Sequence, residues 1–152
     1  MKAKVLVFDS IKISCNAQQA ITVLHNIENI EKYEPKLISA TIRKESDKRG
    51  TYKTKGYFAG VPWKGKFSYE LRENGFYSEM LKSPLSGLKV EGGFIVEQVA
   101  ENECKIIHYE QYFLPLWLLT LVPFLKRYLE KEMIKELKDL KEIILDSIKD
   151  SG

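Results

Sequence analysis

Apolar and polar positions follow their most regular pattern in the last quarter of the chain. Apolar residues recur there every three or four positions, at Val122, Leu125, Leu129, Met133, Leu137, Leu140, Ile144 and Ile148. This spacing places them on one face of an α-helix predicted over residues 123–148. The opposite face carries charged residues, Glu136 among them, and we expect that face to meet water. The single apolar stripe must be buried against another layer of structure.

Seven segments ahead of this helix alternate between apolar and polar residues, which is typical of β-strands. Residues with strong turn preferences, mostly Gly, Pro, Asn and Asp, separate them. The predicted strands cover residues 4–15, 37–45, 51–58, 63–73, 76–82, 90–99 and 104–113. Such a series of short strands predicts a sheet that can cover the apolar stripe of the helix.

The Asn-Gly pair at 74–75 is the strongest hairpin signal in the chain, because both residues tolerate the positive φ of a two-residue type I′ turn. That turn would pair Glu73 with Phe76 and place Tyr69 opposite Met80. The apolar residues of both strands would then share one face of the sheet.

Two short helices are predicted between the first and second strands. Asn16 followed by Gln19 forms a variant of the capping box, which marks a helix start. Apolar residues then recur at helical spacing as far as Tyr33, and Glu34 before Pro35 ends the helical region.

The order of these elements, together with three local segments, resembles the helix-grip superfamily. The segments are Ile11-x-Ile13 with the helix from Asn16, the stretch IENIEKYEPKLISATI at 27–42, and the seventh strand ending at Leu114-Pro115. The superfamily includes START domains, Bet v 1 allergens and polyketide cyclase-like proteins, together called SRPBCC. The resemblance implies one α+β domain over residues 1–152, in which a curved seven-stranded antiparallel sheet wraps around the C-terminal helix.

In that superfamily a cavity between sheet and helix holds an apolar ligand, and the surplus of inward-facing aromatic residues in this chain favours such a pocket. A plain core is the alternative for each aromatic residue taken singly. The residues expected to line the pocket are Tyr52, Phe58, Trp63, Phe67, Tyr69, Met80, Phe94, His108, Glu110, Tyr112, Leu125, Leu129 and Met133.

His108 and Glu110 are the candidates for chemistry. Lys105 and Gln111 prefer water, so the alternation along the seventh strand turns His108 and Glu110 inward, with Gly92 opposite Glu110. Burial is expected to raise the pKa of such a carboxyl group. The pair could orient the polar end of a ligand, or act as acid and base in a cyclase-like reaction.

Two further segments could control access to the pocket. Gly60, Val61 and Pro62, after Ala59, resemble the gate loop of plant hormone receptors of this fold, although the same residues also form ordinary turns. The run from Leu114 to Leu125 has almost no polar face. It could be a buried helix start, a lid, a self-association contact or a membrane-touching patch, the last favoured by Lys126 and Arg127.

Composition removes several other classes of function. The net charge of +3 over 152 residues, with acids and bases interleaved, does not favour nucleic acid binding. No signal peptide or membrane-spanning run is apparent, so we expect a cytoplasmic protein. The two cysteines, Cys15 and Cys104, are expected to lie close together but reduced. Metal-ligand spacing is absent, and no metal or cofactor is expected.

The sequence therefore favours binding of a hydrophobic small molecule, such as a lipid, isoprenoid, quinone or polyketide-like compound. A polyketide cyclase- or dehydrase-like enzyme that uses His108 and Glu110 is the first alternative. An interaction module that docks on a membrane or a protein through the run from Leu114 to Leu125 is the second.

Overall fold

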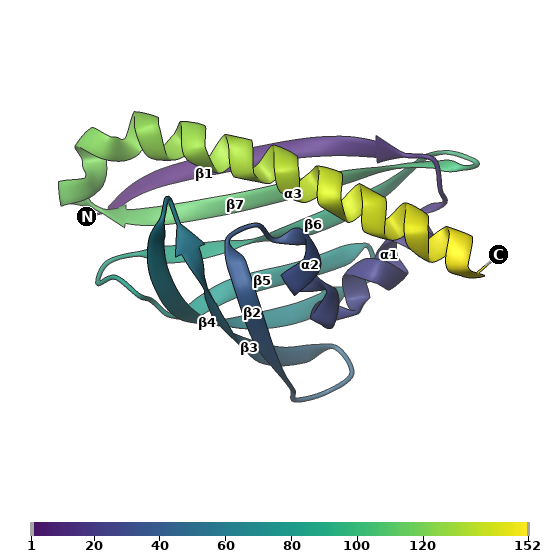
Figure 1. The fold of residues 1–152 in the computed structure, drawn as a ribbon, viewed down its shortest axis with the longest axis horizontal. Helices are drawn as coiled ribbons and strands as arrows, with labels where there is room; N and C mark the ends of the chain where they lie inside the picture. The colour runs from purple at the N-terminus through teal and green to yellow at the C-terminus, as the bar shows by residue number, and fades with distance from the viewer. Residues whose placement is uncertain (1, 152) are drawn as a thin grey trace.

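The computed structural model describes residues 2–151, without the side chains of Lys2 and Ser151. One antiparallel sheet contains β1 (Lys2–Ile13), β2 (Leu37–Lys44), β3 (Arg49–Phe58), β4 (Val61–Arg72), β5 (Gly75–Lys82), β6 (Lys89–Ala100) and β7 (Glu103–Pro115). The strand order is β1-β7-β6-β5-β4-β3-β2. Figure 1 shows this curved sheet with a long helix across its concave side. The predicted architecture is confirmed.

The helices lie where the sequence predicts them. After β1 come α1 (Ala17–His25), a short 3-10 turn η1 (Ile27–Asn29) and α2 (Ile30–Tyr33), and after β7 come η2 (Leu116–Leu121) and α3 (Val122–Ser151). The side chain of Asn16 accepts a hydrogen bond from the backbone N–H of Gln19, and the Gln19 side chain accepts one from the N–H of Asn16. This reciprocal pair is the predicted capping box. Among the described residues, no helix has the length and apolar character needed to span a membrane.

The stripe of α3 packs as its periodicity predicts, with one correction. Leu129, Met133, Leu137, Leu140 and Ile144 are all buried, and α3 contacts β1, α1 and α2. The expectation that Glu136 faces water is wrong, because its side chain is 2% exposed. Glu136 lies three residues after Met133 and four before Leu140, so its position belongs to the buried stripe. Its carboxyl group contacts His108 of β7, as described below.

The predicted register of the β4–β5 hairpin is also wrong. Arg72 pairs with Gly75, and Tyr69 lies opposite Ser78 rather than Met80. The turn residues are therefore Glu73 and Asn74. A Cβ at Gly75 would overlap the carbonyl oxygen of Phe94 on β6, so this glycine permits close approach of a third strand. The register differs from the prediction by two positions, so the paired residues between Phe67 and Met80 stay on their predicted faces.

The turn with positive φ at both central residues lies instead between β3 and β4. Ala59 has a φ of 49° and Gly60 a φ of 83°, as a type I′ hairpin turn requires. Val61 and Pro62, expected in the gate loop, belong to β4.

The β6–β7 pairing has the predicted register at Glu110, a candidate site residue. Gly92 lies opposite Glu110, as predicted. A bulge between Gln98 and Ala100 shifts the pairing by one residue and so brings Gly92 and Glu110 opposite each other.

The two cysteines lie together at the end of the β1–β7 ladder. β1 stops two residues before its predicted end, where the N–H of Cys15 donates to the carbonyl of Ile13. The Sγ atoms of Cys15 and Cys104 are 3.5 Å apart, and both thiols are buried and unbridged. Their predicted proximity is confirmed.

Candidate functional site

A cavity of about 550 Å³ lies between the concave face of the sheet and the first half of α3. That volume is within the range of small-molecule sites. Most of its wall is aliphatic or aromatic. Among the residues that the sequence predicts for a pocket, those on the cavity wall are Tyr52, Phe58, Trp63, Phe67, Met80, Phe94, His108, Glu110, Tyr112, Leu125 and Leu129.

Three predicted residues lie away from the wall. Tyr69 is buried beside Tyr52, with ring centroids 6.2 Å apart. Met133 is one turn of α3 beyond Leu129, where the helix meets the packed core. Gly60 is at the tip of the β3–β4 turn, and a Cβ there would meet nothing within 4 Å.

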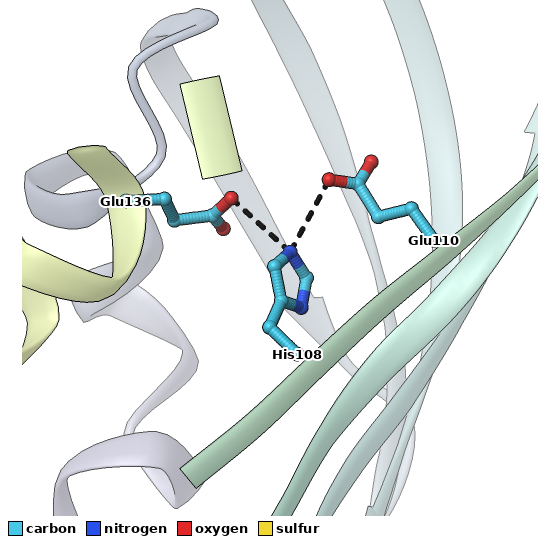
Figure 2. A group of neighbouring side chains, drawn as sticks. All are labelled: His108, Glu110 and Glu136. Atoms are coloured by element: carbon cyan, nitrogen blue, oxygen red, sulfur yellow. Dashed lines mark hydrogen bonds and ion pairs between the residues drawn. The ribbon is translucent and has the colours of Figure 1, made fainter. Parts of the chain in front are cut away.

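His108 is the centre of a buried polar cluster. Its Nδ1 donates a hydrogen bond to the carbonyl oxygen of Gly93 on β6, at 2.8 Å. Its Nε2 lies 3.2 Å from Oε1 of Glu110 and 3.1 Å from Oε2 of Glu136 (Figure 2). Only the Glu110 contact has hydrogen-bond geometry. The imidazole is thus held between a carboxyl group from its own strand and one from α3.

Lys36, which follows α2 and Pro35, brings a cation to the same cluster. Its Nζ lies 2.9 Å from Oε1 of Glu34 and 3.6 Å from Oε1 of Glu110. Both partners are largely buried, and Lys36 itself is 8% exposed. The hydroxyl of Tyr112 donates to the other oxygen of Glu110, at 2.5 Å. Each oxygen of Glu110 therefore has a partner, which offsets the cost of burying the charge.

The two carboxyl groups beside His108 have opposite pKa shifts. Burial raises the pKa of Glu136 from 4.5 to about 8, and the Glu34 carboxylate adds to the increase. Burial also acts to raise the pKa of Glu110, but the Lys36 ammonium and His108 lower it well below its ordinary range. The expectation of a raised pKa at Glu110 is therefore wrong, and the raised value belongs to Glu136. Paired groups with pKa values pushed apart are a feature of acid–base sites.

The two basic groups of the cluster, His108 and Lys36, both have raised pKa values. Burial acts to lower the pKa of His108, but Glu136 and Glu110 hold it well above 6.5. Burial likewise acts to lower the pKa of Lys36, and Glu110 and Glu34 raise it well above 10.5. The cluster therefore holds its own counter-ions for the carboxylates.

Three side chains of this cluster also have ligand atoms within 4.8 Å of one another, namely those of His108, Glu110 and Glu136. A divalent cation accepts such a set of nitrogen and oxygen ligands. The Lys36 ammonium already neutralises Glu110 at this place, and the raised pKa of Glu136 favours its protonated form. The geometry therefore fits an acid–base cluster better than a metal centre.

The other end of the cavity is bordered by segments from three parts of the chain. Its wall there includes Val61 and Pro62 at the start of β4, Pro84 and Leu85 from the β5–β6 loop, and Leu118 and Leu121 of η2. The N–H of Ala59 donates to the hydroxyl of Tyr128 on α3, at 2.9 Å. This bond ties the β3–β4 turn to the helix across the edge of the cavity.

The run from Leu114 to Leu125 is only partly buried. Leu114 is buried, and Leu118, Leu121 and Leu125 face the cavity, whereas Trp117 is 65% exposed. The alternative of a fully buried helix start is therefore wrong.

Sequence reasoning missed three members of the polar cluster, Glu34, Lys36 and Glu136. Glu136 could have been found from the sequence, because its spacing places it within the apolar stripe of α3. A charged residue at such a position needs a buried polar partner. Glu34 and Lys36 flank Pro35 in a short connection with no periodicity, so their direction could not be read from the sequence.

Comparison with known proteins gives the fold a wider context. No protein-family model and no curated protein matches this chain. The Zhui aromatase/cyclase from Streptomyces sp. R1128 has a similar structure, with a TM-score of 0.85 and 10% identity over 99% of each chain. A START superfamily protein from Mycobacterium smegmatis matches with a TM-score of 0.76 and 11% identity, over 93% of this chain and 97% of its own.

Norcoclaurine synthase from Thalictrum flavum is a third similar structure, with a TM-score of 0.71 and 12% identity. The match covers 95% of this chain and 88% of that protein. Identities this low establish the fold alone. The chain therefore has the helix-grip fold that START domains, Bet v 1-like proteins and aromatase/cyclases share.

Proposed function

We propose that this protein binds a hydrophobic small molecule that carries a polar group at one end. The observation that supports this most directly is the cavity of about 550 Å³, whose apolar wall ends at a charged cluster. Apolar walls provide affinity by removing ligand surface from water, and a few convergent polar groups fix its orientation.

The depth of the cluster sets the length of the ligand. Glu110 and His108 lie five and seven residues before Pro115, the last residue of β7. At about 3.3 Å per residue the polar end is roughly 15–25 Å from that end of the strand. Lipids, isoprenoids, quinones and polyketide-like compounds combine such a length with one polar end.

Polar groups on the wall define what the ligand's polar end would meet. Lys36 and His108 are donors, and Glu110 is an acceptor. The indole N–H of Trp63, also on the wall, is buried and has no partner among the described residues. A carbonyl or hydroxyl oxygen of a ligand would satisfy the Trp63 N–H, whereas a pure hydrocarbon would leave it unpaired.

Native mass spectrometry of the purified protein tests the proposal. We expect a bound apolar molecule, or displacement of the probe 8-anilinonaphthalene-1-sulfonate by members of a panel of these ligand classes. Val90→Trp, which fills the cavity from its β6 wall, should abolish both signals. Wild-type protein that carries no ligand and binds neither probe nor panel would contradict the proposal.

Acid–base catalysis in the cavity is a second candidate function. The opposed pKa shifts of Glu110 and Glu136 around His108 favour it. Aromatase/cyclases of the same fold make a cyclisable polyketide the first substrate to test. In this version His108 and Glu110 would transfer protons at the ligand, and Glu136, which is not on the cavity wall, would position His108.

Glu110→Gln separates binding from catalysis because it keeps the shape of the side chain and removes its charge. If the cluster only orients a ligand, affinity should fall by about 1–3 kcal/mol. If the cluster is catalytic, affinity should persist while turnover of a cyclisable substrate collapses. Glu97→Gln, at an exposed position of β6, is the matched control.

A further inference from the structure

A second feature of the molecule is an exposed apolar surface at the end where β1 begins and β7 finishes. Five large side chains between positions 116 and 124 are 48–65% exposed, namely Leu116, Trp117, Leu119, Leu121 and Phe124. We call these five residues the apolar cap. Figure 1 shows η2 and the start of α3 projecting at this end, far from the C-terminus. Contiguous exposed apolar surface of this kind marks a contact with another apolar phase.

The apolar cap is continuous with the cavity. Leu121 belongs to both, and its neighbours Leu118 and Leu125 face inward. Val61 on β4 and Leu85 on the β5–β6 loop also line the cavity, and they are 63% and 36% exposed. The mouth of the cavity is therefore surrounded by apolar side chains from three segments of the chain.

These three segments contain bases and no acids. Residues 59–66, 80–90 and 111–129 include no Asp or Glu, whereas 21 acidic residues occur elsewhere in the chain. Their basic residues are Lys64, Lys66, Lys82, Lys89, Lys126 and Arg127. Of these, Lys89 is paired with Glu79, at 2.7 Å. A surface with apolar residues at its centre and cations around them complements an anionic lipid headgroup layer.

We propose that the rim of the cavity docks on a membrane surface that contains anionic phospholipid. The apolar cap would insert to the boundary between headgroups and acyl chains, and Lys126 and Arg127 would contact phosphates. A second copy of this chain is a poorer partner, because an isologous contact would place the same basic residues face to face. Docking would open the cavity towards the acyl layer, from which a hydrophobic ligand can enter without crossing water.

Vesicle binding by the whole protein tests this. We expect co-sedimentation with vesicles of phosphatidylcholine that contain roughly one third phosphatidylglycerol, and much weaker binding to phosphatidylcholine alone. Added salt should weaken the binding, because it screens the basic residues. The emission of Trp117 should shift to the blue as its ring leaves water, and Trp117→Phe should lose most of that shift.

Two pairs of variants with matched controls locate the contact. Lys126→Gln with Arg127→Gln should weaken binding roughly 30-fold, at about 1 kcal/mol per basic residue. Lys135→Gln with Lys138→Gln, exposed further along α3, should change it little. Phe124→Ser should weaken binding about tenfold. Phe8→Ser, which alters an equally exposed ring on β1, should not.

The proposal fails if the protein does not bind anionic vesicles. It fails as well if the control variants lose as much binding as the Lys126/Arg127 and Phe124 variants. It also fails if sedimentation velocity shows a dimer that the Phe124→Ser variant dissociates, since a second copy would then cover the apolar cap. Val90→Trp, which fills the cavity, should still bind the vesicles, and this separates docking of the rim from the proposed binding of a ligand in the cavity.

Discussion

At the scale of single residues, the unusual feature is a histidine that contacts two carboxyl groups through one nitrogen. Because Nδ1 of His108 donates to a backbone carbonyl, Nε2 is the atom that faces both Glu110 and Glu136. Two ionised carboxylates at one site repel each other, so a proton is favoured on one of them. Lys36 stabilises the charge on Glu110, which leaves the proton on Glu136.

The proton on Glu136 predicts a dependence of stability on pH. The unfolded chain releases this proton near pH 4.5, whereas the folded protein holds it to about pH 8. Between these values the folded state binds more protons, so the free energy of unfolding falls as pH rises. We expect Glu136 to contribute a fall on the order of 1 kcal/mol per pH unit.

Urea denaturation at several pH values between 5 and 8, on wild type and Glu136→Gln, measures this contribution. Glutamine resembles the protonated carboxyl group and does not titrate, so the variant should lose most of the slope between pH 5 and 6.5. Above pH 6.5 the raised pKa of His108 also contributes to the slope. Parallel curves for the two proteins would show that Glu136 is ionised throughout.

At the scale of elements, two hairpins use glycine for different reasons, one in its turn and one at the first residue of its second strand. Gly60 supplies a positive φ in open space, whereas Gly75 makes room for the backbone of β6 at Phe94. The first requirement is conformational, and the second is also steric.

Alanine at each glycine separates these requirements. Gly75→Ala should destabilise the protein by about 3 kcal/mol or more, because its Cβ would displace a neighbouring strand. Gly60→Ala should cost about 1 kcal/mol, the strain of a left-handed conformation alone. Urea denaturation gives both values, and equal costs would refute the close approach at Gly75.

A second feature at this scale is the link between the β3–β4 turn and α3. The Tyr128 ring packs edge-on against Phe58, with centroids 4.9 Å apart, while its hydroxyl accepts the hydrogen bond from Ala59. One side chain thus holds the turn beside the cavity.

Tyr128→Phe keeps the ring contact and removes the hydrogen bond. We expect a loss of stability of about 0.5–1 kcal/mol and, for a turn that gates the cavity, a two- to fivefold faster release of a bound fluorescent probe. Stopped-flow displacement measures the release rate. Tyr57→Phe, which alters an exposed ring beside the same turn, is the control. An unchanged release rate would show that ligands leave by another route.

At the scale of the whole molecule, α3 has two halves with different tasks. Leu125 and Leu129 face the cavity, whereas Leu137, Leu140 and Ile144 pack in a filled core. One helix therefore anchors the fold with its second half and forms a cavity wall with its first.

Leucine-to-alanine variants in the two halves should differ in both stability and binding. Leu140→Ala should cost about 4 kcal/mol, because it opens a void in a packed region. Leu129→Ala should cost about 2 kcal/mol, since Leu129 already borders empty space and makes fewer contacts. Only Leu129→Ala should change probe affinity. Thermal unfolding and titration measure the two effects, and equal costs would contradict the division of the helix.

The sequence by itself determined the elements, their order and the faces of most of their residues, with Glu136 as the exception. Periods of 3.6 and 2 are local properties, so they place Leu140 on the buried stripe of α3 and turn His108 and Glu110 to the concave face of β7. The Asn16–Gln19 cap is local for the same reason. The two-residue period also kept the paired residues between Phe67 and Met80 on their predicted faces when the register of the β4–β5 hairpin proved wrong.

The tertiary structure alone decided which side chains meet. Glu136 could be buried only because His108, 28 positions earlier in the chain, lies opposite it across the interior. The place of Lys36 depends on the course of the short connection between α2 and β2, which has no periodicity. The direction of the pKa shift at Glu110 followed from that cation, because Coulomb interactions depend on distance in space.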